Sequence, residues 1–514
     1  MLRDLNNCEM DIRGRVCIIG SGVGGGTLAK KLAEKNREFI IIEAGEMRGN
    51  SEIIQKDHAG RDFKMETTTS IQLGGTTNLW HGVLSPLDEI DFQKRSWIPY
   101  SGWPINPDDL EPFYKEASSL FGVPDYANYE EDNLPEELKN KLGELSFDRG
   151  YLVNKIFQQH LPPLNFRDVI HDLVKKSDRM HCFYNAAALE LVPGINGGKI
   201  TKLVVANKNG RKIDIYSDIF ICCTGALETP RLLLNSRSVA ENGIGNKHGN
   251  VGRFLMDHPM GNLCQIKFKR PGKAQIYSDI KYMKNIKIKS GLELSEDYQK
   301  SMKLPNHNFF FRPSFVEGID NETEKIKLSL LAIKGGGVTV SDLFKVLTNL
   351  NVIRQILTYK LTLNVRYKFA DLFFVTEQIP NPDSRVTLSD KKDKFGYPVA
   401  RINWQLVPED ILSIKKWFDL LHSTLISEND YTFTHSTEDF DWDNILTTAI
   451  HHVGTARMSS TEREGVVDSN MKVYGTTNLY VSDGSVFTTS GNVNSSLTIS
   501  ALSCKLASHL DRIL

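Results

Sequence analysis

The chain has 514 residues, beyond the length at which one hydrophobic core keeps growing, so we expect two interlocked domains. Lys and Arg number 62 against 63 for Asp and Glu, and the net charge of -1 disfavours binding of nucleic acid or anionic lipid. Seven cysteines lack both the density of a secreted disulfide scaffold and the spacing of zinc ligands, so we expect reduced core residues and no metal site.

The N-terminal residues and the hydropathy predict a location. Residues 1–15 carry several charged side chains and no apolar stretch, which does not fit a secretory signal. No run approaches the roughly 18 consecutive apolar residues of a membrane span. We therefore expect a cytoplasmic protein without a membrane span.

A nucleotide-binding pattern opens the chain. Val16–Ile19 is a short apolar run that predicts a strand, and it ends in the glycine-rich segment 20–26. Residues 27–35 place apolar side chains on one face and predict a helix. The glycine-rich segment contains a G-x-G-x-x-G pattern. Gly20 allows a tight turn, Gly22 lets the backbone approach a pyrophosphate, and Gly25 lets the helix pack closely on the strand.

A second strand, Phe39–Ile42, ends in Glu43, which stands 23 positions after Gly20. A carboxylate at this place accepts hydrogen bonds from a ribose and repels a ribose phosphate. The pattern therefore predicts an unphosphorylated adenosine ribose, as in FAD or NAD, and does not separate the two.

Further strands are predicted at Leu203–Ala206, Lys212–Tyr216 and Ile219–Cys223. Asn209-Gly210 is typical of a hairpin turn between the first two. The third is followed by glycine and by a predicted helix at Glu228–Asn235, which forms a second strand-glycine-helix junction.

Residues 74–82 (GGTTNLWHG) form a second glycine-rich segment. They resemble the flavin loop of the glucose-methanol-choline (GMC) flavin oxidoreductase family, in the style of its sugar-oxidising, pyranose oxidase-like members. Residues 451–458 (HHVGTARM) resemble its catalytic histidine segment, and residues 483–485 followed by Asn494 resemble its last flavin-binding motif. Further similar segments lie at residues 101–105, 225–234, 257–259 and 381–386.

The resemblance implies an α/β fold, with a Rossmann-type FAD-binding domain and an interleaved substrate domain built on a mostly antiparallel sheet with covering helices. We expect FAD-binding segments at 1–95, 181–262 and 441–514, the last with the catalytic residues. We expect the substrate or cap domain at 96–180 and 263–440.

The resemblance implies FAD as cofactor. Many members bond the flavin covalently to a histidine in the loop, but Leu79 stands at that position here, so we expect non-covalent FAD. A shifted alignment makes His81 the alternative attachment point. A helix that starts near Ser495 directs its dipole at the flavin. The predicted cofactor-binding residues are Gly20, Gly22, Gly25, Glu43, Gly74, Gly75, Thr77, Asn78, Trp80, Ala188, Asp483, Gly484 and Ser495.

The resemblance assigns the catalytic base to His451. Oxidation of an alcohol needs a base for the hydroxyl proton, and a histidine is largely neutral near pH 7. The family's second substrate-contacting position is Asn494, which offers a donor and an acceptor to the hydroxyl oxygen. Its alternative role is a turn residue. His452 is predicted to point to the other side, as a packed residue or a weaker candidate for substrate binding.

Three other features carry weaker predictions. His258 either lies near the cofactor or marks a turn at a domain crossing. Glu377 and Gln378 either face the substrate from a strand or pair within the sheet. The apolar stretch 338–367 with interspersed Lys and Arg predicts amphipathic cover helices, with a membrane or partner surface as the alternative.

The motifs favour a sugar, glycoside or related polyol as substrate. Its hydroxyl is oxidised to a carbonyl, with oxygen or a quinone-type compound as electron acceptor. Alternatives are a non-sugar alcohol such as a sterol, an FAD-containing lyase of the hydroxynitrile lyase kind, and a non-catalytic FAD scaffold. The reacting hydroxyl, the choice between oxidase and dehydrogenase, and the oligomeric state stay open.

Overall fold

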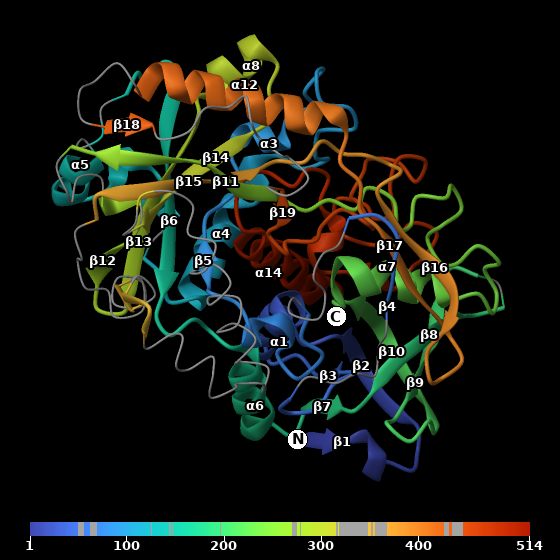
Figure 1. Cartoon of the computed structure of the whole chain (residues 1–514). Coiled ribbons are helices and arrows are strands. Elements are labelled where there is room, and N and C mark those ends of the chain that lie inside the picture. The colour runs from blue at the N-terminus through green and yellow to red at the C-terminus, as the bar shows by residue number, and fades with distance from the viewer. Residues whose placement is uncertain are drawn as a thin grey trace.

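The computed structural model describes residues 1–49, 56–61, 69–124, 126–142, 145, 147–195, 197–269, 275–277, 279–314, 317, 348–350, 353–354, 367–425, 431–433 and 446–514. The predicted amphipathic stretch 338–367 lies largely outside these residues. A sheet with a parallel centre and a large antiparallel sheet form the two ends of the molecule in Figure 1, with helices between them.

The parallel centre of the first sheet is built from chain segments that are far apart in sequence. β2 pairs in parallel with β3 and β10, and β10 pairs with β20 near the C-terminus. The strand predicted at 39–42 is confirmed, whereas the two strands predicted at 212–216 and 219–223 are one, because β10 pairs with β2 along both. The strands are β1 (Leu2–Asp4), β2 (Ile12–Ile19), β3 (Phe39–Ile42), β7 (Met180–Tyr184), β8 (Ala187–Pro193), β9 (Ile200–Ala206), β10 (Lys212–Cys222) and β20 (Leu479–Val481).

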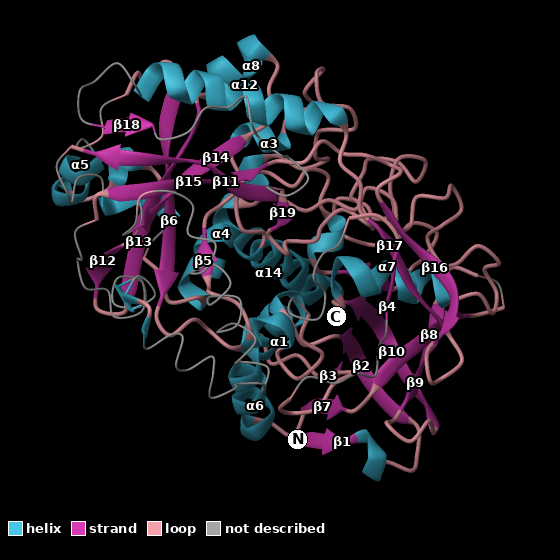
Figure 2. Cartoon of the chain, viewed as in Figure 1, coloured by secondary structure: helices cyan, strands magenta, loops and turns pink. Residues whose placement is uncertain are grey.

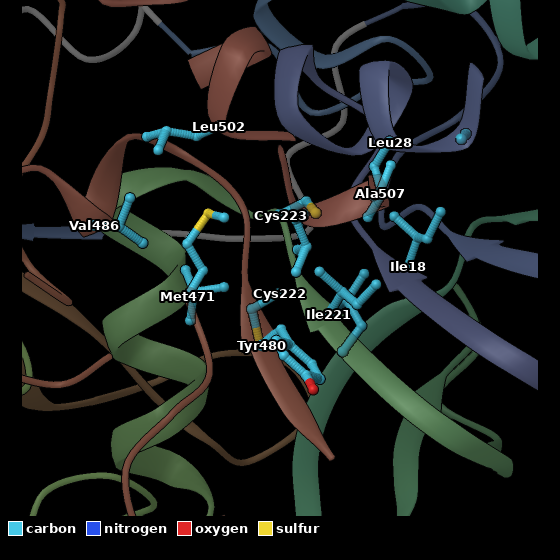
Figure 3. Packing of buried hydrophobic residues seen from close by; sticks show 14 of the residues in the cluster. Ile18, Leu28, Ile221, Cys222, Cys223, Met471, Tyr480, Val486, Leu502 and Ala507 are labelled. Atoms are coloured by element: carbon cyan, nitrogen blue, oxygen red, sulfur yellow. The ribbon is translucent and has the colours of Figure 1, made fainter. Parts of the chain in front are cut away.

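Helices from both ends of the chain cover this sheet. The first begins at Val23, inside the glycine-rich turn and four residues before the predicted start, and it packs on the last helix. Figure 3 shows Ile18, Leu28 and Ala507 in one buried cluster with Cys222 and Cys223. The helices at this end are α1 (Val23–Glu34), α4 (Glu111–Leu120), α6 (Phe166–Lys176), α7 (Gly225–Asn235) and α14 (Ser496–Ile513).

The antiparallel sheet has its own hydrophobic core on the outer face. There Trp417 of α12 stacks on Phe309 of β14 with ring centroids 3.4 Å apart, and Figure 2 shows α12 lying across the strands. The strands are β5 (Val83–Leu84), β6 (Leu152–His160), β11 (Pro259–Phe268), β12 (Ile280–Met283), β13 (Ile286–Leu294), β14 (His307–Ser314), β15 (Phe369–Thr376), β18 (Tyr431–Phe433) and β19 (Thr447–Thr448). The nearby helices are α3 (Glu89–Phe92), α5 (Glu136–Leu142), α8 (Glu296–Met302) and α12 (Pro408–Leu425).

A small sheet lies beside α7 and joins β4 (Lys56–His58), β16 (Arg385–Lys392) and β17 (Pro398–Asn403). The α/β fold class is confirmed. The strands of the parallel-centred sheet come from the predicted FAD-binding segments except for the first residue of β7, but the domain boundaries themselves stay a prediction.

Two properties of the described residues are relevant to function. None of their helices combines the length and apolar character needed to cross a bilayer. They also contain no group of three or more His, Cys, Asp or Glu side chains arranged to hold a metal ion. The seven cysteines all lie in this part of the chain, and none forms a disulfide.

Candidate active site

Of the three glycines in the G-x-G-x-x-G pattern, only Gly22 has open space beside its Cα atom. A Cβ atom on Gly25 would collide with the carbonyl oxygen of Gly20, and Gly20 itself has a φ of +103°. In contrast, a Cβ atom on Gly22 would meet nothing within 4 Å. Gly22 caps the N-terminus of α1, where free N–H groups and the helix dipole favour a pyrophosphate.

Glu43 lies buried at the end of β3, close to this turn. Its Oε1 accepts from the Gly45 N–H at 2.9 Å, and its Oε2 accepts from the N–H of Ser21 at 3.2 Å and from the Ser21 hydroxyl. Burial raises the pKa of Glu43. The segment before β8 lies next to Glu43, because the Ala186 N–H donates to the backbone carbonyl oxygen of Glu43 at 2.9 Å. The predicted cofactor-binding residue Ala188 follows two residues after Ala186.

The predicted flavin loop meets the glycine turn through its backbone. A Cβ atom on Gly75 would lie 3.1 Å from the Cα of Gly22, and the Gly74 N–H donates to the Ser21 hydroxyl at 2.9 Å. The polar side chains of the loop bind other protein groups. The Thr77 hydroxyl donates to Gly74 O at 2.6 Å, Asn78 Nδ2 donates to Leu73 O at 3.0 Å, and Trp80 Nε1 donates to Leu164 O at 2.9 Å.

Asp483 connects the last segment to α7. Its Oδ2 accepts from the Gly225 N–H at 2.8 Å and the Thr229 hydroxyl at 2.6 Å, and its Oδ1 accepts from the Ser485 N–H at 2.9 Å. Burial raises the pKa of this carboxyl. The side chain of Asp483 therefore stabilises the contact between α7 and the last segment. A cofactor at this place would be bound by the backbone of the turn and not by the Asp483 side chain.

Two more predicted residues border this junction. A Cβ atom on Gly484 would lie 3.0 Å from the carbonyl oxygen of His452, so the turn and the histidine segment are in close contact. Ser495 is buried and caps the N-terminus of α14, directly after Asn494. The open space beside Gly22, the buried carboxylate of Glu43 and the two helix N-termini fit a dinucleotide such as FAD.

The two predicted catalytic side chains are in contact. The Nδ2 of Asn494 lies 2.9 Å from the Nε2 of His451. An amide N–H only donates, so Nε2 accepts and the imidazole is neutral, with its proton on Nδ1. Burial, and then the neighbouring His258 and His452, hold the pKa of His451 well below its usual value. In the described part of the chain, Nδ1 has no hydrogen-bond partner.

Asp257 anchors the backbone that carries His451. Its carboxylate accepts from the N–H of His451 at 2.9 Å, from the N–H of Ile450 at 3.1 Å and from the Thr448 hydroxyl. Ile450 has a φ of +65°, an unfavourable conformation for a β-branched residue. These hydrogen bonds stabilise that conformation. The motif 257–259 is recognisable in the sequence, but the role of Asp257 is not, because nothing local shows which backbone it binds.

His258 packs against the predicted base, His451. Its ring centroid is 5.2 Å from that of His451, and the rings are nearly perpendicular at 79°. Its Nδ1 lies 3.3 Å from Thr376 O, and burial lowers its pKa to about 4. The motif therefore places His258 beside the predicted base.

His452 lies close to the carboxylate of Asp257. Its Nε2 lies 3.8 Å from Asp257 Oδ2. Burial and the charges of Lys56 and His58 lower its pKa to about 3. It is a packed neighbour of the Asp257 anchor, and its substrate-binding role stays a prediction.

The side chains of Glu377 and Gln378 bind other protein groups. Both follow the end of β15 instead of lying within a strand. Glu377 forms a buried two-point ion pair with Arg95, with 2.8 Å between Arg95 Nη1 and Oε2. Gln378 Oε1 accepts from the Asp257 N–H at 3.0 Å and from Trp404 Nε1 at 2.8 Å. These contacts favour the alternative of paired framework residues, and direct contact with substrate stays a prediction.

Comparison with known proteins places the C-terminal part of the chain in a family. Residues 380–503, which include His451, Asp483 and Asn494, match the family model described as GMC oxidoreductase. This part of the chain is a GMC oxidoreductase domain. The chain is an FAD-dependent oxidoreductase that acts on CH–OH groups.

Curated relatives match nearly the whole GMC chain at low identity. The 2-methyl-1,2-propanediol dehydrogenase of Mycolicibacterium austroafricanum is 22% identical and covers 97% of this chain and 95% of its own. The fructose dehydrogenase large subunit of Gluconobacter japonicus is 23% identical, with 96% of each chain covered. The paromamine 6'-oxidase of Streptomyces fradiae is 22% identical and covers 95% of this chain and 89% of its own.

Solved structures share the fold. Pyridoxine 4-oxidase from Mesorbium loti superposes with a TM-score of 0.60 at 16% identity, covering 96% of this GMC chain and 98% of its own. A formate oxidase from Aspergillus oryzae RIB40, studied for FAD modification, gives a TM-score of 0.58 at 18% identity, covering 98% and 99%.

Proposed function

We propose that this GMC enzyme oxidises a hydroxyl of a sugar, glycoside or related polyol to a carbonyl, with His451 as the base. The observation that carries the proposal is the 2.9 Å contact between His451 Nε2 and Asn494 Nδ2. Because the imidazole and the amide lie within hydrogen-bond distance of each other, a substrate oxygen that enters between them would contact both. Such an oxygen gives its proton to Nε2 and accepts from the amide.

The state of His451 suits proton abstraction. Its lowered pKa keeps the imidazole neutral at cytoplasmic pH, with the Nε2 lone pair available. A base positioned in this way contributes about 10²- to 10⁴-fold to the rate. Asn494 fixes the substrate oxygen and limits its rotation, and the Asp257 anchor holds the histidine backbone in place.

We propose that FAD is held without a covalent bond. Gly20, Gly22 and Gly25 would hold the pyrophosphate at the N-terminus of α1, and Glu43 would bind the ribose. When bound, FAD supplies the acceptor for the hydride that leaves the carbinol carbon. Leu79 has no atom that can bond to a flavin, and His81 is exposed, with its carbonyl oxygen accepting from Gln159 at 2.5 Å.

The relatives support a polyhydroxylated substrate. Their names specify fructose, a propanediol and paromamine, all of which carry more than one hydroxyl group. They include both dehydrogenases and an oxidase. We therefore propose oxygen or a quinone-type compound as the electron acceptor.

Anaerobic bleaching of the flavin tests the proposal. The purified holoenzyme is mixed without oxygen with D-glucose, D-fructose, methyl β-D-glucoside, glycerol, cholesterol and mandelonitrile, and the visible flavin absorption is followed. We expect a sugar or polyol to bleach it and the His451→Ala variant to bleach at least about 100-fold more slowly. Admission of air or a quinone to the reduced enzyme then identifies the acceptor. Absence of bleaching by every sugar and polyol would refute the proposed function.

A further inference from the structure

A row of residues in register crosses the inner face of the antiparallel sheet. Glu293 lies opposite Asn308, Asn308 opposite Val375, and Val375 opposite Met260. Met260 in turn pairs with Thr447 of β19. Directly opposed residues of antiparallel strands project to the same face, so these side chains share one face.

The two ends of this row are attached to the two catalytic segments. At one end, Glu293 Oε2 accepts from Asn492 Nδ2 at 2.9 Å, two residues before Asn494. At the other end, Thr447 stands four residues before His451 in the segment anchored by Asp257. The face that carries the row is therefore the one directed at the catalytic pair, and Asn308 lies between its ends.

Asn308 is a buried amide that nothing in the described protein satisfies. Its side chain has no solvent exposure, and neither Oδ1 nor Nδ2 has a hydrogen-bond partner there. A buried amide without hydrogen-bond partners destabilises the fold, so its presence calls for an explanation. The sheet makes room for it, because a Cβ atom on Gly291 of β13 would collide with Asn308 Oδ1.

Aromatic side chains continue the same face beyond Asn308. Phe310 follows two residues later on β14, lies opposite Phe373 of β15, and packs on Phe157 of β6 with ring centroids 4.9 Å apart. Cations already cover these rings, because Lys289 Nζ lies 4.0 Å from the Phe310 ring centroid and the Arg312 guanidinium lies 3.3 Å from that of Phe373. The Asn308 amide is therefore the group of this row that offers a donor and an acceptor to a hydroxyl.

We propose that Asn308 is a specificity-determining residue whose carboxamide hydrogen-bonds a substrate hydroxyl other than the one that is oxidised. This inference rests on the proposed function and names the group that selects polyhydroxylated substrates over simple alcohols. A site built to hydrogen-bond a hydroxyl rejects an analogue that lacks it, because the buried polar group is then left unpaired.

The test compares the best sugar of the bleaching panel with its deoxy analogues, each lacking one of the non-reacting hydroxyls. Anaerobic stopped-flow gives the Kd of each probe for the wild-type enzyme and for Asn308→Leu. For one deoxy position we expect the wild type to lose about tenfold in affinity, whereas Asn308→Leu binds sugar and analogue equally. The matched control is Gln158→Leu, since Gln158 is also buried with both amide atoms unpartnered in the described structure, but on the opposite face of the sheet. It should keep the wild-type discrimination.

The outcomes separate the two proposals. If no sugar or polyol bleaches the wild type, the proposed function fails and the inference falls with it. If a sugar bleaches the wild type but Asn308→Leu discriminates every deoxy analogue as the wild type does, the role of Asn308 alone is overturned. Flavin content and melting temperature report on folding. Where Asn308→Leu does not fold, Asn308→Asp, which keeps the size and one acceptor, must change the ranking of the analogues or the inference fails.

Discussion

The carboxylate of Asp257 accepts a hydrogen bond from the backbone N–H of His451 at 2.9 Å. It also binds the preceding N–H of Ile450, whose backbone has a positive φ, and the N–H of His258. One buried carboxylate thus fixes the position of the proposed base without touching its imidazole.

A pH dependence follows from this anchor. Burial raises the pKa of Asp257 to about 6, whereas the pKa of His451 is lowered well below its usual value. Protonation of Asp257 converts one acceptor oxygen into a donor and breaks hydrogen bonds to the histidine segment. We expect the rate constant of flavin reduction to fall as the pH decreases through about 6, and this acid limb to disappear in Asp257→Asn, whose rate constant is at least about tenfold lower at pH 8. A pH profile of anaerobic flavin reduction measures both. A limb retained in Asp257→Asn would assign it to another group.

The contact between His451 and Asn494 predicts strongly non-additive effects. If both side chains act on one substrate oxygen, loss of either disrupts the same step. We expect His451→Ala to reduce the rate of flavin reduction by about 10²- to 10⁴-fold, Asn494→Ala by a smaller factor, and the double variant little more than His451→Ala. Stopped-flow rates of the four enzymes complete the cycle. Fully multiplicative losses would mean that the two residues serve separate steps.

The glycine turn predicts two different defects. Ala at Gly22 places a methyl group in the open space beside α1, so Gly22→Ala should fold but bind FAD at least about tenfold more weakly. Ala at Gly25 collides with Gly20 O, so Gly25→Ala should lower the stability of the fold itself. Thermal melting with and without added FAD distinguishes the loss of FAD affinity from the loss of stability. The control is Gly194→Ala, whose added Cβ atom would lie 3.3 Å from Thr201 Cγ2. Unchanged FAD affinity in Gly22→Ala would move the pyrophosphate elsewhere.

The buried ion pair between Arg95 and Glu377 predicts a structural defect. Removing one partner leaves an uncompensated buried charge, which costs about 3–5 kcal/mol. Glu377→Gln should therefore lower the free energy of unfolding by that amount while leaving the order of preferred substrates unchanged. Urea unfolding and the sugar panel measure the two effects. A changed substrate order with full stability would restore Glu377 to the substrate site.

The sequence predicted correctly those strands that are determined by a short local pattern of residues. The strand before the glycine turn and the strand at 39–42 follow from short apolar runs that end at a glycine or a polar residue. The interruption predicted between residues 216 and 219 was wrong, because β10 gains its pairing from β2 and β20, which no local pattern reveals.

The candidate site could be predicted only where a motif carries it. His451 and Asn494 stand in recognisable segments, and the structure brings them into contact. The role of Asp257 could not be predicted, since its partner lies 194 residues away. The same holds for Glu377 and Arg95, which are 282 residues apart and belong to different predicted domains.

The close contact of Gly24 with the carbonyl of Ser482 has a consequence for biosynthesis. Gly24 and Ser482 are 458 positions apart, so the dinucleotide turn is synthesised long before β20 completes its sheet and α14 covers its helix. During that interval the apolar faces that β20 and α14 later cover are exposed. Chaperone dependence during synthesis is the expected consequence of this separation between the two halves of one nucleotide fold.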